Sequence, residues 1–448
     1  MARTTPFGRE IRRAHFNFAP SYTPLNHGSF GAFPSSVREY QRRRQDETEA
    51  KPDTFLRFTY PRLLREAREA VAPLLGAETN EVVFVPNALT AINTVLRNLT
   101  YEEGDVILHF STIYDGCLKT IQSLEETTEA RAYCIELTYP AEDDEIVHSF
   151  RTAILRILSQ GGTARLALFD TVISFPGVRF PWESLVSVCK EYNILSCIDG
   201  AHGIGHIDLR HVPDVGPDFF ITNCYKWLMV PRGCTVLYVP YRNQARIKTT
   251  YPTSEGYLPR AQRGALSSES YFVNLFERVS TVDVTPYLCV VEALRFRDQV
   301  CGGEARVRNY SQDVAREGGK LMAAVLGTEV LENRTGTLRG CCFANVRLPL
   351  EVADTQHEGG REGKVPAEDA KAVADWITRT SVDEFDTFIA TRYYAGAFWV
   401  RISGQIYLER ADFEWAATVL LELCSRVTQQ KAHYDIADVE RDDFLLIR

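Results

Sequence analysis

The sequence predicts an α/β protein, with a large domain built on a mostly parallel sheet and a smaller α+β domain after it. Between residues 81 and 239, short apolar runs rich in β-branched residues alternate with longer amphipathic stretches. Near-continuous apolar strands separated by helices are typical of a parallel sheet that is covered on both faces. From about residue 290 helical and strand-like segments mix. We therefore expect an N-terminal arm (1–20), a large domain (21–290) and a small domain (291–448).

Individual elements of the large domain follow from local patterns. Apolar runs bounded by turn residues predict strands at 81–87, 105–110, 164–172, 194–199, 218–223 and 234–239. Amphipathic segments predict helices at 88–99 and 181–193. After the large domain, a helix over 287–303 ends in Gly-Gly, strands are expected at 341–348 and 397–404, and the polar, Gly-rich segment 351–370 is expected to be an exposed loop.

Composition narrows the functional class. The chain has 448 residues, 45% of them hydrophobic, and a net charge of −9, which argues against a nucleic-acid binder because those usually present a basic face. It contains no run of 18 apolar residues that could span a membrane, and its N-terminus lacks the apolar core of a secretory signal. Eleven scattered cysteines form no disulfide or zinc pattern. A cytoplasmic protein fits these features best.

One acid and one lysine lie beside buried segments, where a charge is costly unless it is paired with an opposite charge or takes part in binding or catalysis. Asp199 closes the strand 194–199, and Lys226 follows the next strand. Ligands of open α/β sheets bind at the carboxyl ends of strands, so we expect both residues over one crevice. A lysine in a partly dry pocket becomes a nucleophile toward carbonyls, and a carboxylate holds a pyridinium nitrogen protonated. On these two residues alone, a simple Asp–Lys salt bridge remains an alternative.

A candidate anion site lies at the turn between the first expected strand and its helix. In "PNALTAIN" the turn places Asn87, Ala88, Leu89 and Thr90 at a helix N-terminus, where free N–H groups and the helix dipole attract an anion. N-capping by Asn87 or Thr90 would explain the same residues without a ligand. The spacing of His202 and His206 permits zinc, but the segment is Gly-rich and lacks a glutamate between them, so no metal is expected.

Six motifs occur in the order found in one enzyme family: "NHGSFG" (26–31), "PNALTAIN" (86–93), "SFPGVRFP" (174–181), "DGAHGIG" (199–205), "NCYKW" (223–227) and "RISG" (401–404). From about residue 20 to 420 the chain resembles the class V, fold-type I pyridoxal-phosphate enzymes, in the isopenicillin-N-epimerase-like and cysteine-desulfurase-like branch. Within it, the chain is most similar to the fungal C–S lyases of ergothioneine biosynthesis, which cleave hercynylcysteine sulfoxide. The resemblance implies a seven-stranded, mostly parallel sheet and pyridoxal 5'-phosphate as cofactor.

The resemblance also implies residue roles. Lys226 would bind the cofactor covalently, Asp199 would contact the pyridine nitrogen, and His202 would approach the phenolic oxygen. Tyr114 takes the place of the histidine that many relatives stack on the ring, and a phenol there can donate a proton to a leaving sulfur. Further cofactor contacts are expected from Ala88, Leu89, Thr90, Asn223 and Tyr225.

Substrate contacts are implied in the same way. Arg401 matches the family's arginine for the α-carboxylate, a bidentate role that suits a guanidinium, and Asn26 and His27 would lie near the substrate. Ser254 and Thr281 lie in segments that the family lends to the cofactor site of a partner subunit, so a homodimer is expected. Two residues depart from the pattern: Tyr225 stands where the branch commonly has histidine, and Glu255 stands where the compared lyases have histidine.

The expected reaction is β-elimination from a cysteine conjugate or cysteine sulfoxide, releasing pyruvate and ammonia. Arg401 would hold the carboxylate and Lys226 would remove the α-proton. The alternatives within the family are an amino-acid epimerase or an alkaloid-forming enzyme that works by γ-elimination or decarboxylative cyclisation. A desulfurase would need a catalytic cysteine on a flexible loop, and the apolar setting of Cys341-Cys342 indicates core instead. A non-enzymatic scaffold that kept the fold is the alternative of another class.

Overall fold

The computed structural model describes the chain except for residues 1–3, 255, 266–270, 280, 354–362 and 430–448. A seven-stranded sheet has the order β1-β7-β6-β5-β4-β2-β3, and a three-stranded sheet has the order β8-β10-β9. The strands are β1 Val82–Val85, β2 Asp105–Phe110, β3 Arg131–Ile135, β4 Thr163–Asp170, β5 Leu195–Asp199, β6 Phe219–Asn223, β7 Thr235–Tyr238, β8 Phe343–Arg347, β9 Ala390–Tyr394 and β10 Ala397–Ser403. The expected fold class is confirmed.

The large sheet is mostly parallel, as expected. The β3–β2, β2–β4, β4–β5 and β5–β6 pairs are parallel, whereas β7 is antiparallel to both of its neighbours. The six expected strands of this sheet are present. Sequence analysis did not identify β3, an edge strand with several exposed positions that lacks the apolar run on which the other strands were recognised.

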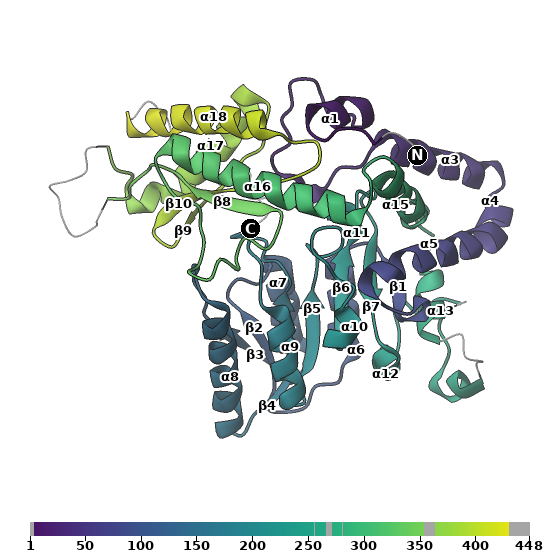
Figure 1. The fold of residues 1–448 in the computed structure, drawn as a ribbon. Helices are drawn as coiled ribbons and strands as arrows, with labels where there is room; N and C mark the ends of the chain where they lie inside the picture. Colours follow the sequence, from purple (N-terminus) through teal and green to yellow (C-terminus); the bar gives the residue numbers. More distant parts are fainter. Residues whose placement is uncertain (1–3, 255, 266–270, 280, 354–362, 430–448) are drawn as a thin grey trace.

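Helices follow the strands in an alternating order (Figure 1). The N-terminal helices are α1 Arg9–His15, α2 His27–Phe30, α3 Ser35–Ala50, α4 Pro52–Thr54 and α5 Tyr60–Leu75, with a π-helical turn at Phe55–Thr59 and a 3₁₀ turn at Thr79–Glu81. Those between the strands of the large sheet are α6 Ala88–Asn98, α7 Asp115–Thr127, α8 Asp143–Ser159, α9 Trp182–Glu191, α10 Val212–Val215 and α11 Cys224–Trp227.

After β7 come α12 Tyr241–Gln244, a 3₁₀ turn at Arg260–Ala265, α13 Tyr271–Glu277, α14 Thr285–Leu288, α15 Val290–Gln299 and α16 Glu304–Leu326. A 3₁₀ turn at Ala367–Asp369, α17 Ala370–Phe385 and α18 Arg410–Thr428 complete the described chain. The long helix expected over 287–303 therefore consists of α14 and α15, and the stop at Gly302-Gly303 separates α15 from α16. Of the expected loop 351–370, residues 354–362 lie outside the described residues.

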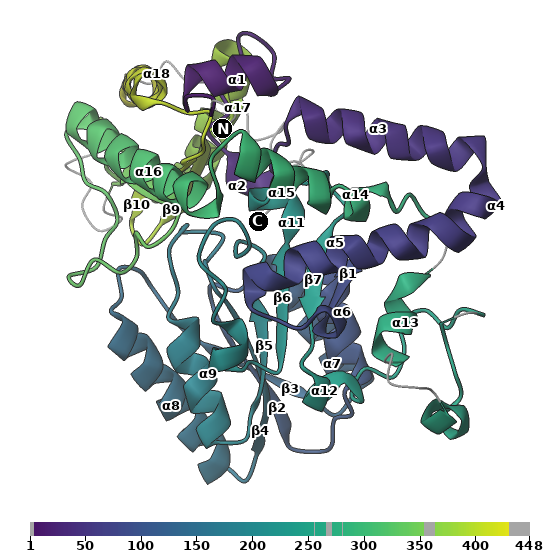
Figure 2. The ribbon, with the colours of Figure 1, turned by 45° about the vertical axis from the view of Figure 1, so that its right-hand side comes forward.

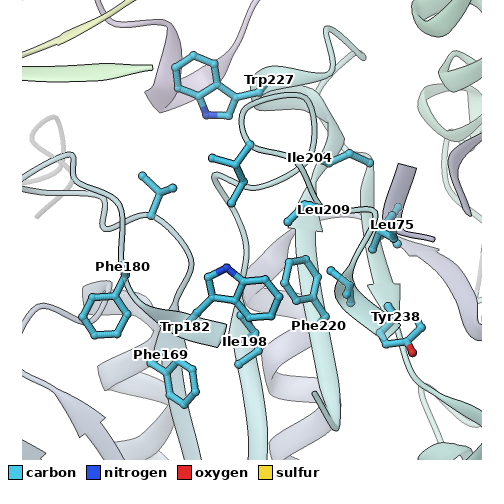
Figure 3. Close-up of a cluster of buried hydrophobic side chains, with 14 of the residues drawn as sticks. Leu75, Phe169, Phe180, Trp182, Ile198, Ile204, Leu209, Phe220, Trp227 and Tyr238 are labelled. Carbon is cyan, nitrogen blue, oxygen red and sulfur yellow. The ribbon is translucent and has the colours of Figure 1, made fainter. Parts of the chain in front are cut away.

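The two faces of the large sheet bury different helices because successive strand residues point to opposite sides. Leu166 and Leu168 of β4 pack with α6, α7 and α13, whereas Ala167 and Phe169 pack with α5, α8 and α9. Figure 3 shows part of the second cluster, with Trp182 between β4 and β6 residues. The odd-numbered residues of β5 follow the first face, so Asp199 at the strand end points toward the α6 and α7 side.

The smaller sheet has its own core with α16, α17 and α18. The helices α16 and α18 lie over the same end of the large sheet, and the N-terminal α1 lies beside α18 (Figures 1 and 2). Ile11 and Phe16 of the N-terminal segment belong to this smaller core. The boundaries 1–20, 21–290 and 291–448 remain predictions.

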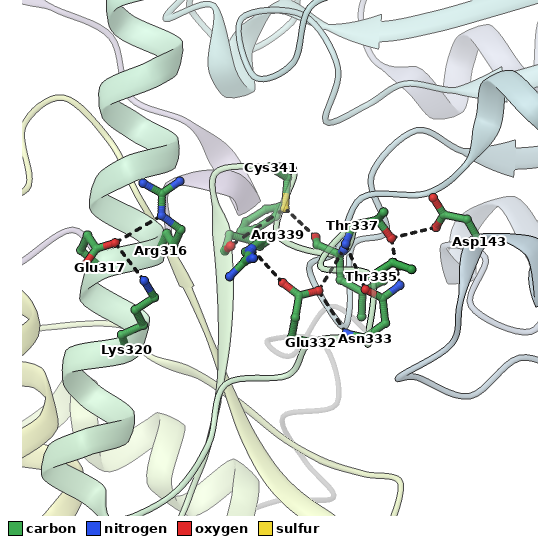
Figure 4. A network of polar contacts seen from close by, with 12 residues as sticks. Asp143, Arg316, Glu317, Lys320, Glu332, Asn333, Thr335, Thr337, Arg339 and Cys341 are labelled. Carbon is green, nitrogen blue, oxygen red and sulfur yellow. Dashed lines mark hydrogen bonds and ion pairs between the residues drawn. The ribbon is translucent and has the colours of Figure 1, made fainter.

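A polar network fastens the segment before β8 to the large domain (Figure 4). Thr337 Oγ1 donates to Asp143 of α8 at 3.0 Å, and Asn333 donates to Thr337 at 2.8 Å. Glu332 accepts from the backbone N–H of Leu338 and pairs with Arg339 at 3.3 Å. This segment leads directly into β8, whose first residue lines the candidate site.

None of the described helices is both long enough and apolar enough to cross a membrane. All eleven cysteines are free thiols, and ten of them are buried.

Candidate active site

The residues expected over one crevice come together where β4, β5 and β6 end. Asp199 is the last residue of β5, and α11, which carries Lys226, follows β6 without a gap. Asp199 is buried, and its Oδ1 accepts the backbone N–H of Ala201 at 2.9 Å. Its Oδ2 accepts from the Cys117 thiol of α7 at 3.5 Å. Burial raises the pKa of Asp199 above its ordinary value, and the N–H of Ala201 and the charge of Lys226 oppose that shift.

Lys226 has an unusual environment for an amine. Burial lowers the pKa of Lys226 from 10.5 to about 8, the charge of Asp199 opposes that change, and Arg401 adds to it. Its Nζ lies 3.2 Å from His202 Nε2. No salt bridge joins Lys226 to Asp199 in the described structure, although their charges interact. The simple salt-bridge alternative is therefore not what the structure contains.

Buried Arg297 of α15 holds the two segments that carry these residues in place. Its Nη1 donates to the carbonyl of Trp227 at 3.0 Å, and its Nη2 donates to the carbonyl of Gly205 at 3.3 Å. Glu304 pairs with the same guanidinium. The loop after β5 and the helix α11 are thereby fixed to each other.

The N-terminus of α6 lies at the same edge of the sheet. Asn87 caps it, with Oδ1 accepting from Thr90 N–H at 2.8 Å and Thr90 Oγ1 at 3.1 Å. Asn223 Oδ1 accepts from Ala88 N–H at 3.1 Å. Asn87 is thus the N-cap of α6, and Thr90 is the residue that it caps. Leu89 N–H has no hydrogen-bond partner among the described residues and remains available to an anion. Cofactor contacts of Ala88, Leu89 and Thr90 stay predictions.

Two phenols approach the carboxylate from different elements. Tyr114 is partly buried at the N-cap of α7, where burial and then the charges of Cys117 and Asp199 raise its pKa. Burial, followed by Asp199 and Tyr114, raises the pKa of Tyr225 to about 12. Both side chains are therefore neutral and able to donate a proton at neutral pH.

Arg401 of β10 comes from the smaller domain and is buried. Its Nη1 donates to the carbonyl of Ser174, and its Nη2 donates to Asn26 Oδ1 at 2.8 Å and Ser29 Oγ at 3.0 Å. The guanidinium lies 4.6 Å above the ring of Phe343, the first residue of β8. Its Nε has no partner, and no carboxylate among the described residues pairs with it. An unpaired buried cation is costly, so this arrangement suits an anionic ligand.

His27 packs against Trp227, the residue that follows Lys226. Its Nδ1 is 2.6 Å from the Tyr407 hydroxyl, its ring packs edge-on against Trp227 at 5.0 Å, and burial lowers its pKa to about 3. Its Nε2 has no partner among the described residues. A substrate contact for His27 stays a prediction.

Ser254 and Thr281 are exposed, and neither is hydrogen-bonded to a pocket residue in the described structure. Glu255 lies outside the described residues. The expected roles of Ser254 and Thr281 in a partner's site stay predictions.

Sequence reasoning missed several neighbours of the site. Cys117, which donates to Asp199, and Phe343, beneath Arg401, lie outside the family motifs. Ser29, which accepts from Arg401, and Trp227, beside His202, lie within "NHGSFG" and "NCYKW" but were assigned no role. Asp170, the last residue of β4, is buried directly opposite Asp199 in the parallel register. Only its place at the end of an apolar strand could have marked it.

The residues present fit pyridoxal phosphate in the chemistry of their donors and acceptors. A buried carboxylate with an oxygen that accepts only from a thiol can hold a ring N–H, an amine whose pKa is lowered to about 8 can attack an aldehyde in its neutral form, and a helix N-terminus with a free N–H can accept a phosphate. The three groups come from separate elements that meet at one edge of the sheet.

The chain is similar to several known enzymes. The family model "Aminotransferase class-V" matches residues 56–262. An L-cysteine desulfhydrase-like protein lolT1 of Epichloe uncinata is 36% identical, over 96% of this chain and 98% of the relative. The hercynylcysteine sulfoxide lyase of Schizosaccharomyces pombe is 30% identical, over 95% of this chain and 100% of the relative. A solved cystine C–S lyase, C-DES, is 16% identical with a TM-score of 0.68, over 90% of this chain and 97% of that one, and shares the fold.

Proposed function

Because the chain belongs to the aminotransferase class V family of pyridoxal-phosphate-dependent enzymes, we propose that it is a C–S β-lyase for an amino acid with sulfur on its β-carbon. The family assignment confirms the cofactor and the enzyme class, a pyridoxal-phosphate-dependent lyase, that the sequence predicted. The substrate's sulfur-side group and the products, pyruvate and ammonia, belong to the proposal.

The observation that carries the proposal is Arg401, a buried cation without an anion that lies close enough to Lys226 to lower its pKa. Three of the five guanidinium N–H groups are engaged by Ser174, Asn26 and Ser29. Two donors remain for a carboxylate. An α-amino acid bound there would have its amine and α-carbon on the side of Lys226.

Pyridoxal phosphate, when bound, supplies an aldehyde that joins an amine covalently and a ring that takes up the electrons of a broken C–H bond. Lys226 would hold it covalently, Asp199 would keep the ring nitrogen protonated, His202 would lie at the phenolic oxygen, and Leu89 N–H with Asn223 would lie near the phosphate. These roles follow from the family resemblance and from the donors and acceptors described above.

Three residues of this chain have separate roles in the elimination. Arg401 holds the carboxylate, and Lys226 Nζ in its neutral form takes the α-proton. Tyr114 Oη donates a proton to the departing sulfur, because a thiol leaves more readily than a thiolate. The raised pKa of Tyr114 keeps this proton in place at neutral pH.

A desulfurase reaction finds little support. It would require a reactive cysteine on an accessible loop, but Cys341 and Cys342 are both buried. Burial raises the pKa of Cys341 to about 12. Thiolates, not thiols, are the nucleophiles, so this pair belongs to the core, as expected from its apolar setting.

The experiment that tests the proposal is incubation of purified enzyme with cysteine, S-alkylcysteines and cysteine sulfoxides, with pyruvate measured by a coupled dehydrogenase. Pyruvate should appear with the native chain and not with Lys226→Ala. If the substrate's α-proton exchanges with deuterium from the solvent while no pyruvate forms, the lyase proposal fails and epimerisation becomes the better reading. A relative at 27% identity, the isopenicillin N epimerase of Streptomyces clavuligerus, makes that outcome the natural second candidate.

We also propose a homodimer in which Ser254 and Thr281 of each subunit complete the cofactor site of the other. Both are exposed in the single chain, as is expected of residues that contact a partner subunit. Mixing Lys226→Ala with Thr281→Ala subunits should give hybrid dimers in which one of the two sites has all its native residues. No recovery of activity above that of the separate variants would contradict shared sites.

A further inference from the structure

Two buried histidines beside Lys226 have every ring nitrogen within hydrogen-bond distance of a partner. His202 contacts Lys226 Nζ and the indole of Trp227, and His206 contacts the backbone of His202 and of Cys342. An indole N–H and a backbone N–H can only donate. These two donors decide which ring nitrogen carries the proton in each histidine.

His206 has a single permitted tautomer. The backbone N–H of Cys342 donates to its Nε2, which must therefore be unprotonated in the neutral ring. Its Nδ1 then carries the proton and donates to the carbonyl of His202 at 2.8 Å. Burial lowers the pKa of His206 to about 3, so the ring is neutral at physiological pH.

His202 has the opposite tautomer. The indole N–H of Trp227 donates to its Nδ1 at 3.1 Å, so the proton of the neutral ring lies on Nε2. Burial, aided by the charges of Lys226 and Arg401, lowers the pKa of His202 well below its ordinary value, and the ring is neutral. Its Nε2–H faces Lys226 Nζ at 3.2 Å.

The direction of that last hydrogen bond favours one protonation state of the lysine. An ammonium group has three donors and no acceptor, so it cannot accept from His202 Nε2–H. A neutral amine has a lone pair and can. The opposite tautomer of His202 would present a lone pair to Lys226 and would stabilise the ammonium instead.

Trp227 is held firmly enough to impose this choice. It is fully buried, stacked on His206 with ring centroids 4.0 Å apart and an interplanar angle of 27°, and packed edge-on against His27. Arg297 binds its backbone carbonyl. The indole cannot turn its N–H away from His202 without displacing these rings.

We propose that Trp227 is a positioning residue that fixes His202 as the Nε2–H tautomer and thereby favours the neutral amine of Lys226 over its ammonium form. This inference rests on the proposed role of Lys226 as the amine that binds the cofactor's aldehyde. Trp227 touches neither reacting atom; it acts through the imidazole. His206 supports it by stacking on the indole.

The test compares Trp227→Phe with Trp182→Phe in the cofactor-free enzyme. Each variant replaces a fully buried indole with a phenyl ring, but the Trp182 N–H has no hydrogen-bond partner in the described structure. Figure 3 shows both side chains, Trp182 against the sheet and Trp227 above it. The two variants therefore share the loss of volume and differ in the loss of a hydrogen bond.

The main readout is the rate at which added pyridoxal phosphate becomes bound to Lys226, followed by absorbance from pH 6 to pH 10. At pH 7, Trp227→Phe should react about two- to tenfold more slowly than the native chain, the effect of one net hydrogen bond, and its pH profile should shift upward. Trp182→Phe should follow the native profile. Identical profiles for all three proteins would overturn the inference.

A second readout observes the native chain directly and distinguishes failure of this inference from failure of the proposed function. Nitrogen NMR of the native chain with ¹⁵N-labelled histidine should find the His202 proton on Nε2, assigned by its loss in His202→Gln. A proton on Nδ1 would overturn the inference while leaving the lyase proposal intact. If the native chain does not bind pyridoxal phosphate through Lys226 at all, the proposed function fails first.

Discussion

Arg401→Lys tests the carboxylate site most sharply, because it keeps the positive charge and removes the fork of donors. The native guanidinium satisfies Ser174, Asn26 and Ser29 and still has two N–H groups for a ligand. An ammonium has three donors in all, so it cannot serve the same protein acceptors and a carboxylate as well. At least one charge-assisted hydrogen bond to the substrate should be lost.

The size of the effect follows from that one bond. Hydrogen bonds to charged groups contribute about 1.5–3 kcal/mol, so kcat/KM for an amino-acid substrate should fall about 10- to 150-fold. The fall should appear mainly in KM, since Lys226 and Asp199 are untouched. Arg392 of the neighbouring strand β9 provides the control, and Arg392→Lys should change kcat/KM much less.

The assay compares two ligands that differ only in the carboxylate. S-methylcysteine and its decarboxylated analogue, 2-(methylthio)ethylamine, are titrated into the cofactor-loaded enzyme and followed by the change in absorbance. The native enzyme should prefer S-methylcysteine, and Arg401→Lys should lose most of that preference. An undiminished preference in Arg401→Lys, or an equal loss of affinity for both ligands, would refute a role of Arg401 in binding the carboxylate.

Other consequences can be measured with simple variants and pH profiles. Because the pKa of Lys226 is lowered to about 8, about one lysine in ten is neutral at pH 7. The rate at which the cofactor-free enzyme binds pyridoxal phosphate should therefore rise toward pH 8 and level off above it. A rate that still rises steeply at pH 10 would contradict this. Tyr114→Phe should slow elimination about 10²- to 10⁴-fold for alkylthiol leaving groups and much less for nitrophenylthiol, which leaves without a proton; an equal loss for both would exclude Tyr114 as the proton donor. Asp199→Asn should still bind the cofactor but exchange the α-proton of the substrate far more slowly, and native exchange rates would exclude Asp199 from the electron-sink role. Gly31→Ala should lower the free energy of unfolding by about 2–4 kcal/mol, because Gly31 has φ +66° and a Cβ there would lie 1.8 Å from the Tyr225 carbonyl; an unchanged denaturant midpoint would contradict the close approach.

The parts of the fold with a strong local signal could be predicted from the sequence. Strands buried on both faces, such as β4 and β5, appear as continuous apolar runs, and their ends fixed the place of Asp199. The edge strand β3 is partly exposed and lacked that signal. The antiparallel direction of β7 depends on a short connection through α11, and strand composition does not encode direction.

The site residues, too, differ in whether the sequence around them carries a local signal. Lys226 and Asp199 could be found because a charge beside a buried segment is conspicuous in one dimension. Arg401 needed the family resemblance, since an arginine after an apolar strand is ordinarily a surface group. The role of Trp227 could not be found, although the residue ends the motif "NCYKW": a tryptophan beside an apolar run predicts core, and only the three-dimensional structure places its N–H on His202.

The most direct test of the whole account is chemical trapping of the cofactor on the native enzyme. Reduction of the pyridoxal-phosphate-loaded chain with borohydride, followed by digestion and mass spectrometry, should find one phosphopyridoxyl group per chain, on Lys226. The Lys226→Ala variant should retain none. A label on a different lysine, or no label on a native chain that has taken up the cofactor, would contradict the central claim that Lys226 is the residue that holds it.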